Sequence, residues 1–263
     1  MDKVTSRDGT PIAFDQLGDG PPVIVVCGAM CDRALMRPTA EELAKHFTVF
    51  NYDRRGRGDS RDTTPYAVER EIEDLGALVA EAGGTASVYG HSSGAVLVLH
   101  AAAAGLPIAK VVLHEPPFSP DEEEWRRRSR EYGENLRTIL AEDRRGDAVE
   151  LFMTMVGTPQ EMVEGMRHTP RWAELEAIAP TLAYDSEVMG DIGRGGTTPL
   201  DLLGAVTIPA LVLVGGASPE WMIDVGRQIA DGMPNGRHWV LEGQEHVVAP
   251  EILVPVLAEF FAE

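Results

Sequence analysis

Short apolar runs that alternate with amphipathic stretches are the feature of this 263-residue chain that most constrains its fold. Runs such as Val23–Cys27 and Ala210–Val214 are continuous and rich in β-branched residues, which is typical of parallel strands buried on both faces. Because helix-like segments separate the runs, we predict an α/β protein with a mostly parallel sheet and helices on both sides. The expected strands are Ile12–Phe14, Val23–Cys27, Thr48–Tyr52, Ala86–Tyr89, Val111–His114, Ala210–Val214 and His238–Leu241. The expected helices are Ala40–His46, Ala67–Ala82, Ser93–Ala104, Glu220–Asp231 and Glu251–Phe261.

Two segments depart from this alternation. Near the N-terminus, expected strands around Lys3–Ser6 and Pro11–Leu17 are joined by the turn Arg7-Asp8-Gly9, which predicts an antiparallel edge of the sheet. Residues 118–200 carry apolar positions at helical spacing, which predicts a helical cap inserted into a sheet domain of residues 1–117 and 201–263. The methionines of the cap form either ordinary core or an adaptable wall over a substrate pocket, and they are Met153, Met155, Met162, Met166 and Met189.

The charge balance and the cysteine content argue against several classes of protein. With 23 Lys and Arg against 42 Asp and Glu, the net charge is −19, which disfavours binding to nucleic acids and to anionic membranes. No apolar run reaches the roughly 18 residues that span a bilayer, and the N-terminal residues MDKVTSRDGT do not form a secretory signal. Cys27 and Cys31 do not make up a zinc site, so we expect no metal and a reduced, cytoplasmic protein.

The segment Gly90-His91-Ser92-Ser93-Gly94 has the pattern G-x-S-x-G and lies directly between an expected strand and an expected helix. In that context the sharp turn strains the backbone of Ser92 and lifts its hydroxyl above the sheet. The flanking glycines avoid clashes where strand and helix pack closely, and the helix N-terminus adds positive potential. We therefore predict that Ser92 is a nucleophile rather than part of a purely structural turn.

A serine that attacks a carbonyl group needs N–H donors for the oxyanion that forms. One donor is expected to be the backbone N–H of Ser93, which follows the nucleophile. The other is expected from the turn Cys27-Gly28-Ala29-Met30 after the apolar run VIVVC, where glycine allows a tight turn. The N–H of Ala29 is the preferred donor, and the N–H of Gly28 or Met30 is the alternative.

The chain resembles serine hydrolases of the α/β-hydrolase fold over nearly its whole length. Besides the motif around Ser92, the resemblance rests on FNYDRRGRGDS (Phe50–Ser60), on GQEHVVAP (Gly243–Pro250) and on the order of serine before histidine. It implies an α/β-hydrolase fold, with an eight-stranded, mostly parallel sheet and an inserted helical cap. Asp53 and Asp59 could be mistaken for catalytic acids, and we interpret them as turn caps that pair with Arg54, Arg55 or Arg57.

His246 is the expected general base, since it follows the last strand in a loop that can return to the top of the sheet beside the nucleophile. Many members of the family carry the acid after the strand that here is Ala210–Val214, but that position is Ser218. Glu220 is the nearest acid there. Glu115 is preferred, because a carboxylate at the end of the buried strand before it needs a partner that offsets its desolvation.

The location of Glu115 resembles that of the acid in haloalkane dehalogenases and in zearalenone lactonases, which carry a similar H-E-x-P stretch. Serine in place of an aspartate nucleophile excludes dehalogenase and epoxide-hydrolase chemistry. The resemblance therefore implies a hydrolase that cleaves a small-molecule ester or lactone through an acyl-enzyme, without a cofactor, as a monomer or homodimer. The expected substrate contacts are Gly28, Met30, Met155 and Trp172, the last in a Pro-x-Trp segment similar to one in the lactonases.

The same set of residues serves other functions in proteins of this fold. Carbon–carbon hydrolases, hydroxynitrile lyases and polyketide-tailoring cyclases use it in enzymes, and small-molecule receptors can retain it. A lyase or cyclase should turn over few members of an ester panel. A receptor should combine slow turnover with tight binding.

Overall fold

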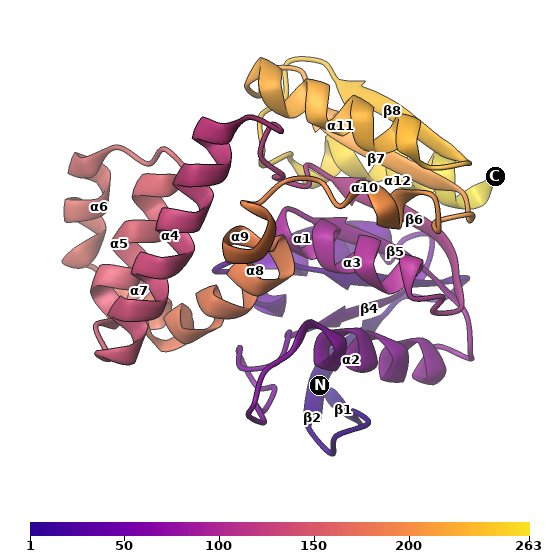
Figure 1. The fold of residues 1–263 in the computed structure, drawn as a ribbon. Coiled ribbons are helices and arrows are strands. Elements are labelled where there is room, and N and C mark those ends of the chain that lie inside the picture. Colours follow the sequence, from indigo (N-terminus) through magenta and orange to yellow (C-terminus); the bar gives the residue numbers. More distant parts are fainter. The chain divides into compact units, whose positions relative to one another are not determined.

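A computed structural model describes residues 1–263, and the chain divides into two compact units (Figure 1). The sheet unit comprises Met1–Phe118 and Thr198–Glu263, and the helical unit comprises Ser119–Thr197. The helical unit lies within the stretch that the sequence predicts as the cap. No helix of either unit is long and apolar enough to cross a bilayer.

The sheet has eight strands in the order β1-β2-β4-β3-β5-β6-β7-β8. β2 pairs antiparallel with β1 and with β4, and the remaining neighbours pair in parallel. The mostly parallel sheet and its antiparallel edge confirm the predicted fold class, and β7 is buried along its whole length, as a continuous apolar run predicts. The strands are β1 (Asp2–Thr5), β2 (Pro11–Leu17), β3 (Pro22–Val26), β4 (Thr48–Tyr52), β5 (Ala86–His91), β6 (Ile108–His114), β7 (Ala210–Gly215) and β8 (Gly236–Leu241).

The helices of the sheet unit follow the strands in the expected alternation. The largest difference is at α1, which was predicted as Ala40–His46 but begins at Arg33 and ends at Leu43. The side chain of Asp32 caps this helix by accepting a hydrogen bond from the N–H of Leu35 at 2.9 Å, and the helix continues through Pro38, which conceals its first turns in the sequence. These helices are α1 (Arg33–Leu43), α2 (Val68–Glu81), α3 (Ser93–Ala103), α10 (Leu200–Leu203), α11 (Glu220–Gly232) and α12 (Pro250–Ala262).

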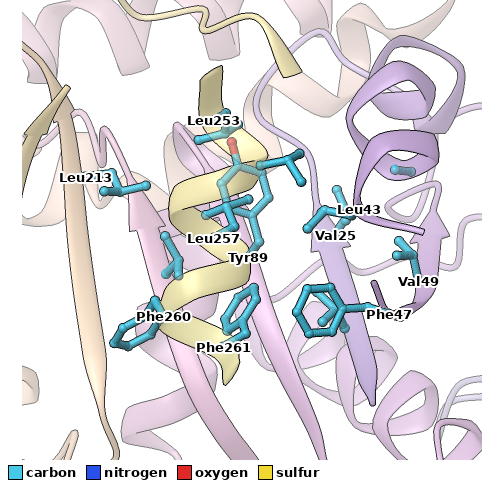
Figure 2. Packing of buried hydrophobic residues seen from close by; sticks show 14 of the residues in the cluster. Val25, Leu43, Phe47, Val49, Tyr89, Leu213, Leu253, Leu257, Phe260 and Phe261 are labelled. Carbon is cyan, nitrogen blue, oxygen red and sulfur yellow. The ribbon is translucent and has the colours of Figure 1, made fainter. Parts of the chain in front are cut away.

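A core of apolar side chains joins α1 and α12 to one face of the sheet (Figure 2). Phe261 of α12 meets Phe47 edge to face at 5.9 Å between ring centroids. Leu257, from the same helix, is buried with Tyr89 of β5 and Val25 of β3. Burial of these side chains stabilises the sheet at β3 and β5. The expected oxyanion loop follows β3, and the expected nucleophile follows β5.

The helical unit is built from helices alone, and α4 packs against α5, α8 and α9. Val149 of α5 and Leu175 of α7 belong to its buried interior. Ser119 and Thr197 form an isolated β-bridge that joins the two ends of the unit. Its helices are α4 (Glu123–Ala141), α5 (Arg145–Met155), α6 (Gln160–Arg167), α7 (Pro170–Ile178), the 3-10 helix η1 (Ala179–Thr181), α8 (Leu182–Met189) and α9 (Asp191–Arg194).

Candidate active site

Ser92 occupies a strained turn between the end of β5 and the start of α3. Its backbone has φ 57° and ψ −127°, a conformation that non-glycine residues rarely adopt. The Ser92 N–H donates to the carbonyl of His114 at the end of β6, which ties the turn to the neighbouring strand. A Cβ at Gly90 would lie 2.7 Å from Ala95, and one at Gly94 would lie 2.5 Å from the β3 backbone. Both glycines are therefore required by close packing around the serine.

The loop after β3 lies directly against this serine. A Cβ at Gly28 would sit 2.9 Å from the Cβ and 3.5 Å from the Oγ of Ser92, so the glycine backbone approaches the nucleophile closely. Ala29 is partly exposed, and Met30 is buried with a left-handed φ of 55°. Ser93 is the first residue of α3, so its N–H lies at the positive end of the helix dipole. Ser93 and Gly28, the residue before the preferred donor Ala29, thus both adjoin Ser92 in the sheet unit.

His246 and Glu115 meet in the same unit. The Nδ1 of His246 lies 2.5 Å from the Oε2 of Glu115, whose side chain is fully buried. Glu115 follows β6 with a left-handed φ of 49°, and His246 lies in the loop between β8 and α12. Glu220, the alternative acid, is exposed at the start of α11. Of the two candidate acids, Glu115 is the one that the fold brings to His246.

The second carboxylate oxygen of Glu115 is held by two further donors that sequence analysis missed as functional residues. Its Oε1 accepts from the Gly215 N–H at 2.7 Å and from the Ser218 hydroxyl at 2.6 Å. Burial acts to raise the pKa of Glu115, but hydrogen bonds from His246, Ser218 and Gly215 outweigh it and leave this pKa below its usual value. The group is therefore ionised at neutral pH. Ser218 stands at the position where many members of the family carry the acid. This position was the sequence feature that could have identified Ser218 as a functional residue.

His91 supports the loop that carries His246. Its Nε2 lies 2.9 Å from the His246 carbonyl oxygen, which can only accept, so we assign the proton to this nitrogen. The imidazoles of His91 and His246 are tilted by 40° at 4.7 Å between centroids, and those of His91 and His114 are tilted by 51° at 5.0 Å. Burial, reinforced by the charge that His246 can carry, lowers the pKa of His91 to about 4. His91 is therefore a neutral hydrogen-bond donor at physiological pH. The sequence did not predict this role, because His91 occupies one of the unspecified positions of the G-x-S-x-G motif.

The two predicted substrate contacts of the cap, Trp172 and Met155, lie in the helical unit. Trp172 is buried, its Nε1–H donates to Glu176 at 3.0 Å, and the Arg167 guanidinium lies 5.1 Å from its ring centroid. These contacts give Trp172 a packing role inside the unit. Met155 is exposed at the end of α5. Contact of either side chain with a substrate stays a prediction.

Asp53 and Asp59 take part in the turn after β4, but with a partner that the sequence interpretation did not name. Asp53 accepts from the backbone N–H of Asp59 at 2.9 Å, and both carboxylates bind the guanidinium of Arg33 on α1. Arg33 is distant in sequence and reaches them only through the fold.

No group of three or more His, Cys, Asp or Glu side chains is arranged to hold a metal ion.

The sequence is similar to known proteins along most of its length. Residues 23–251 match the model of the alpha/beta hydrolase family. An alpha/beta hydrolase from Sphaerobacter thermophilus DSM 20745 is 50% identical, with 99% of this chain and 100% of that one covered and a TM-score of 0.86. A thermophilic esterase from Thermogutta terrifontis shares the fold at 23% identity, over 99% of this chain and 97% of that one, with a TM-score of 0.70. Hydrolase YraK of Bacillus subtilis (strain 168), described as uncharacterized, is 36% identical over 95 residues, which span 35% of each chain.

Proposed function

The chain belongs to the alpha/beta hydrolase family, and we propose that within it the protein is a serine hydrolase that cleaves a carboxylic ester or a lactone. The proposed nucleophile, base and acid are Ser92, His246 and Glu115. One observation carries the proposal. A buried carboxylate lies 2.5 Å from the imidazole Nδ1 in the same unit as a serine held in a strained elbow, which is the arrangement of groups that nucleophilic triads use.

In the proposed reaction, Ser92 Oγ attacks the carbonyl carbon of the substrate and gives its proton to Nε2 of His246. Nε2 is the available nitrogen because Nδ1 faces Glu115. The ionised Glu115 stabilises the imidazolium, and the N–H groups of Ala29 and Ser93 bind the oxyanion. The imidazolium then protonates the departing alcohol oxygen and leaves an acyl group on Ser92. A water molecule, deprotonated by the same imidazole, releases the carboxylic acid and restores the serine.

A lactone is the narrower form of this proposal. Its support is the location of Glu115 after β6, in a His-Glu-Pro-Pro stretch that resembles the lactonases of the fold. The esterase named among the structural neighbours supports the broader ester class. Hydrolysis rates for p-nitrophenyl alkanoates and for aryl-fused macrolactones, measured side by side, distinguish the two.

The test of the proposal is the Ser92→Ala variant together with a fluorophosphonate probe. We expect kcat for esters to fall by about 10⁴-fold or more, and the probe to modify Ser92 in the wild-type protein, as found by peptide mass spectrometry. Ser87→Ala, on the same strand, is the matched control. Activity within about tenfold of wild type in Ser92→Ala would reject the nucleophile. Modification of Ser92 without ester turnover would favour a lyase, a cyclase or a receptor.

A further inference from the structure

Three buried arginines follow β4, and the proposed mechanism uses none of them. They are Arg54, Arg55 and Arg57, and none of them is more than 1% exposed. The guanidinium of Arg57 reaches the loop after β3, where Nη1 donates to the carbonyl oxygen of Gly28 at 2.5 Å and to that of Cys31 at 3.2 Å. Hydrogen bonds from a charged donor are stronger than those between neutral groups. Arg57 therefore clamps both ends of the turn that contains the expected oxyanion donor.

The carbonyl of Gly28 belongs to the same peptide group as the N–H of Ala29. A trans peptide is planar, so its C=O and N–H bonds point in opposite directions. Because the carbonyl points toward buried Arg57, the Ala29 N–H points away from Arg57. Gly28 itself faces Ser92, within 2.9 Å of its Cβ if a Cβ were added. The hydrogen bond from Arg57 thus sets the direction of the Ala29 amide beside the nucleophile.

We propose that Arg57 is a positioning residue of the oxyanion hole, which orients and polarises the Gly28–Ala29 peptide for the developing oxyanion. This inference rests on the proposed serine-hydrolase function. A donor that is already oriented needs no reorganisation in the transition state. A carbonyl that accepts from a cation also strengthens the N–H donor at the other end of its peptide, because hydrogen bonds in a chain polarise one another.

The contact with Cys31 adds a second constraint on the turn. Met30 lies between the two clamped carbonyls with a left-handed φ of 55°, a conformation that is strained for a residue with a side chain. Such strain persists only where surrounding contacts hold it. Without Arg57 the turn is expected to relax, and the Ala29 amide would move with it.

Arg55 is a matched control in the same loop. It is also fully buried, but its guanidinium binds Asp74 of α2 at 2.7 Å and Asp8 of the β1–β2 turn at 3.0 Å. Removal of either arginine leaves buried partners without a donor, so both changes are expected to lower stability. Of these two changes, only the one at Arg57 is expected to alter the oxyanion hole.

The test compares Arg57→Lys and Arg57→Gln with Arg55→Lys. Two readouts are used, steady-state hydrolysis of a p-nitrophenyl ester and inhibition by an alkyl trifluoromethyl ketone, which adds to Ser92 and forms a tetrahedral oxyanion. For the Arg57 variants we expect kcat to fall by about 10- to 100-fold, inhibitor affinity to fall by a similar factor and KM to change less than about threefold. Arg55→Lys should lower Tm while kcat and inhibitor affinity stay within about threefold of wild type.

Equal losses of kcat in Arg57→Lys and Arg55→Lys would overturn the inference, as would Arg57 variants with wild-type kcat and inhibitor affinity. Arg57 variants that fail to fold while Arg55→Lys folds would also reject it, because Arg57 would then act on stability alone. A wild-type protein that neither hydrolyses the ester nor binds the ketone would instead refute the proposed function, before any Arg57 variant is compared.

Discussion

Burial and charge oppose one another at Glu115. Its side chain is fully enclosed, yet hydrogen bonds from His246, Ser218 and Gly215 hold its pKa below the ordinary value despite the effect of burial. Its backbone is also left-handed. A strained backbone and a buried charge persist together only where many contacts determine both, and such positions cluster at functional sites.

Glu115→Gln keeps the size of the side chain and removes its negative charge. The imidazole of His246 would lose the group that stabilises its cationic form, so we expect kcat to fall by about 10²- to 10⁴-fold. Steady-state ester hydrolysis measures the effect, and Glu220→Gln serves as the control because Glu220 is exposed on α11. If Glu220→Gln lost most of its activity while Glu115→Gln stayed active, the acid would lie after β7 instead.

Ser218→Ala removes one of the donors that keep Glu115 ionised. The pKa of Glu115 should rise, because the hydrogen bond from Ser218 lowers it. We therefore expect the acid limb of the kcat–pH profile to move to higher pH, with kcat at neutral pH reduced by about 3- to 30-fold. An acid limb that coincides with that of the wild type would show that Ser218 does not tune Glu115.

Among the elements, α9 of the helical unit begins with an aspartate whose charged form is disfavoured by its buried surroundings. Asp191 is 6% exposed, and burial raises its pKa to about 6, although hydrogen bonds from Ser129 and Ser186 act against this rise. Because the folded state binds the proton more tightly than the unfolded chain, this group favours folding most below about pH 4. Its contribution declines as the pH rises from about 4 to 6, by roughly 3 kcal/mol in all.

Asp191→Asn should therefore stabilise the protein in a pH-dependent way. Asparagine is neutral at every pH, so the free energy of unfolding should rise by about 1–3 kcal/mol at pH 7.5 and change little at pH 4. Urea unfolding followed by circular dichroism at both pH values measures this. The control is Asp201→Asn at an exposed position. A destabilised Asp191→Asn protein at pH 7.5 would mean that the ionised carboxylate is required.

For the molecule as a whole, the imidazoles of His91 and His114 should dominate the response to acid. Burial lowers the pKa of His91 to about 4 and holds that of His114 well below its usual value, whereas an unfolded histidine titrates near about 6.5. The unfolded chain thus binds more protons in this interval, and stability is lost as the pH falls from about 6.5 to 4, by roughly 3 kcal/mol for His91 alone. The loss at His114 has the same sign, so the two imidazoles together are expected to outweigh the opposite contribution of Asp191.

The variant His91→Asn tests this expectation, since an amide can still donate to the carbonyl of His246. The free energy of unfolding should then fall less steeply between pH 6.5 and 4 than in the wild type. His46→Asn, at an exposed position, should leave the slope unchanged. Identical slopes for wild type and His91→Asn would show that His91 does not titrate on unfolding.

The sequence by itself determined the class of the fold and the position of the serine elbow. Both depend on local patterns, because short apolar runs rich in β-branched residues are typical of strands buried on both faces, as in β7. The tight turn at Ser92 requires glycine at nearby positions for steric reasons that any chain would share. The start of α1 at Arg33 was not predicted, since Pro38 interrupts the local helical signal.

Only the tertiary structure decided which charged groups meet. Glu115 and His246 are 131 residues apart, and Arg33 reaches Asp53 and Asp59 from another element. Sequence patterns left two candidate acids because each follows a strand at the same edge of the sheet. Which carboxylate lies beside His246 depends on how β6, β7 and the loop after β8 pack together. Contacts of this kind are set by three-dimensional proximity, which no local spacing encodes.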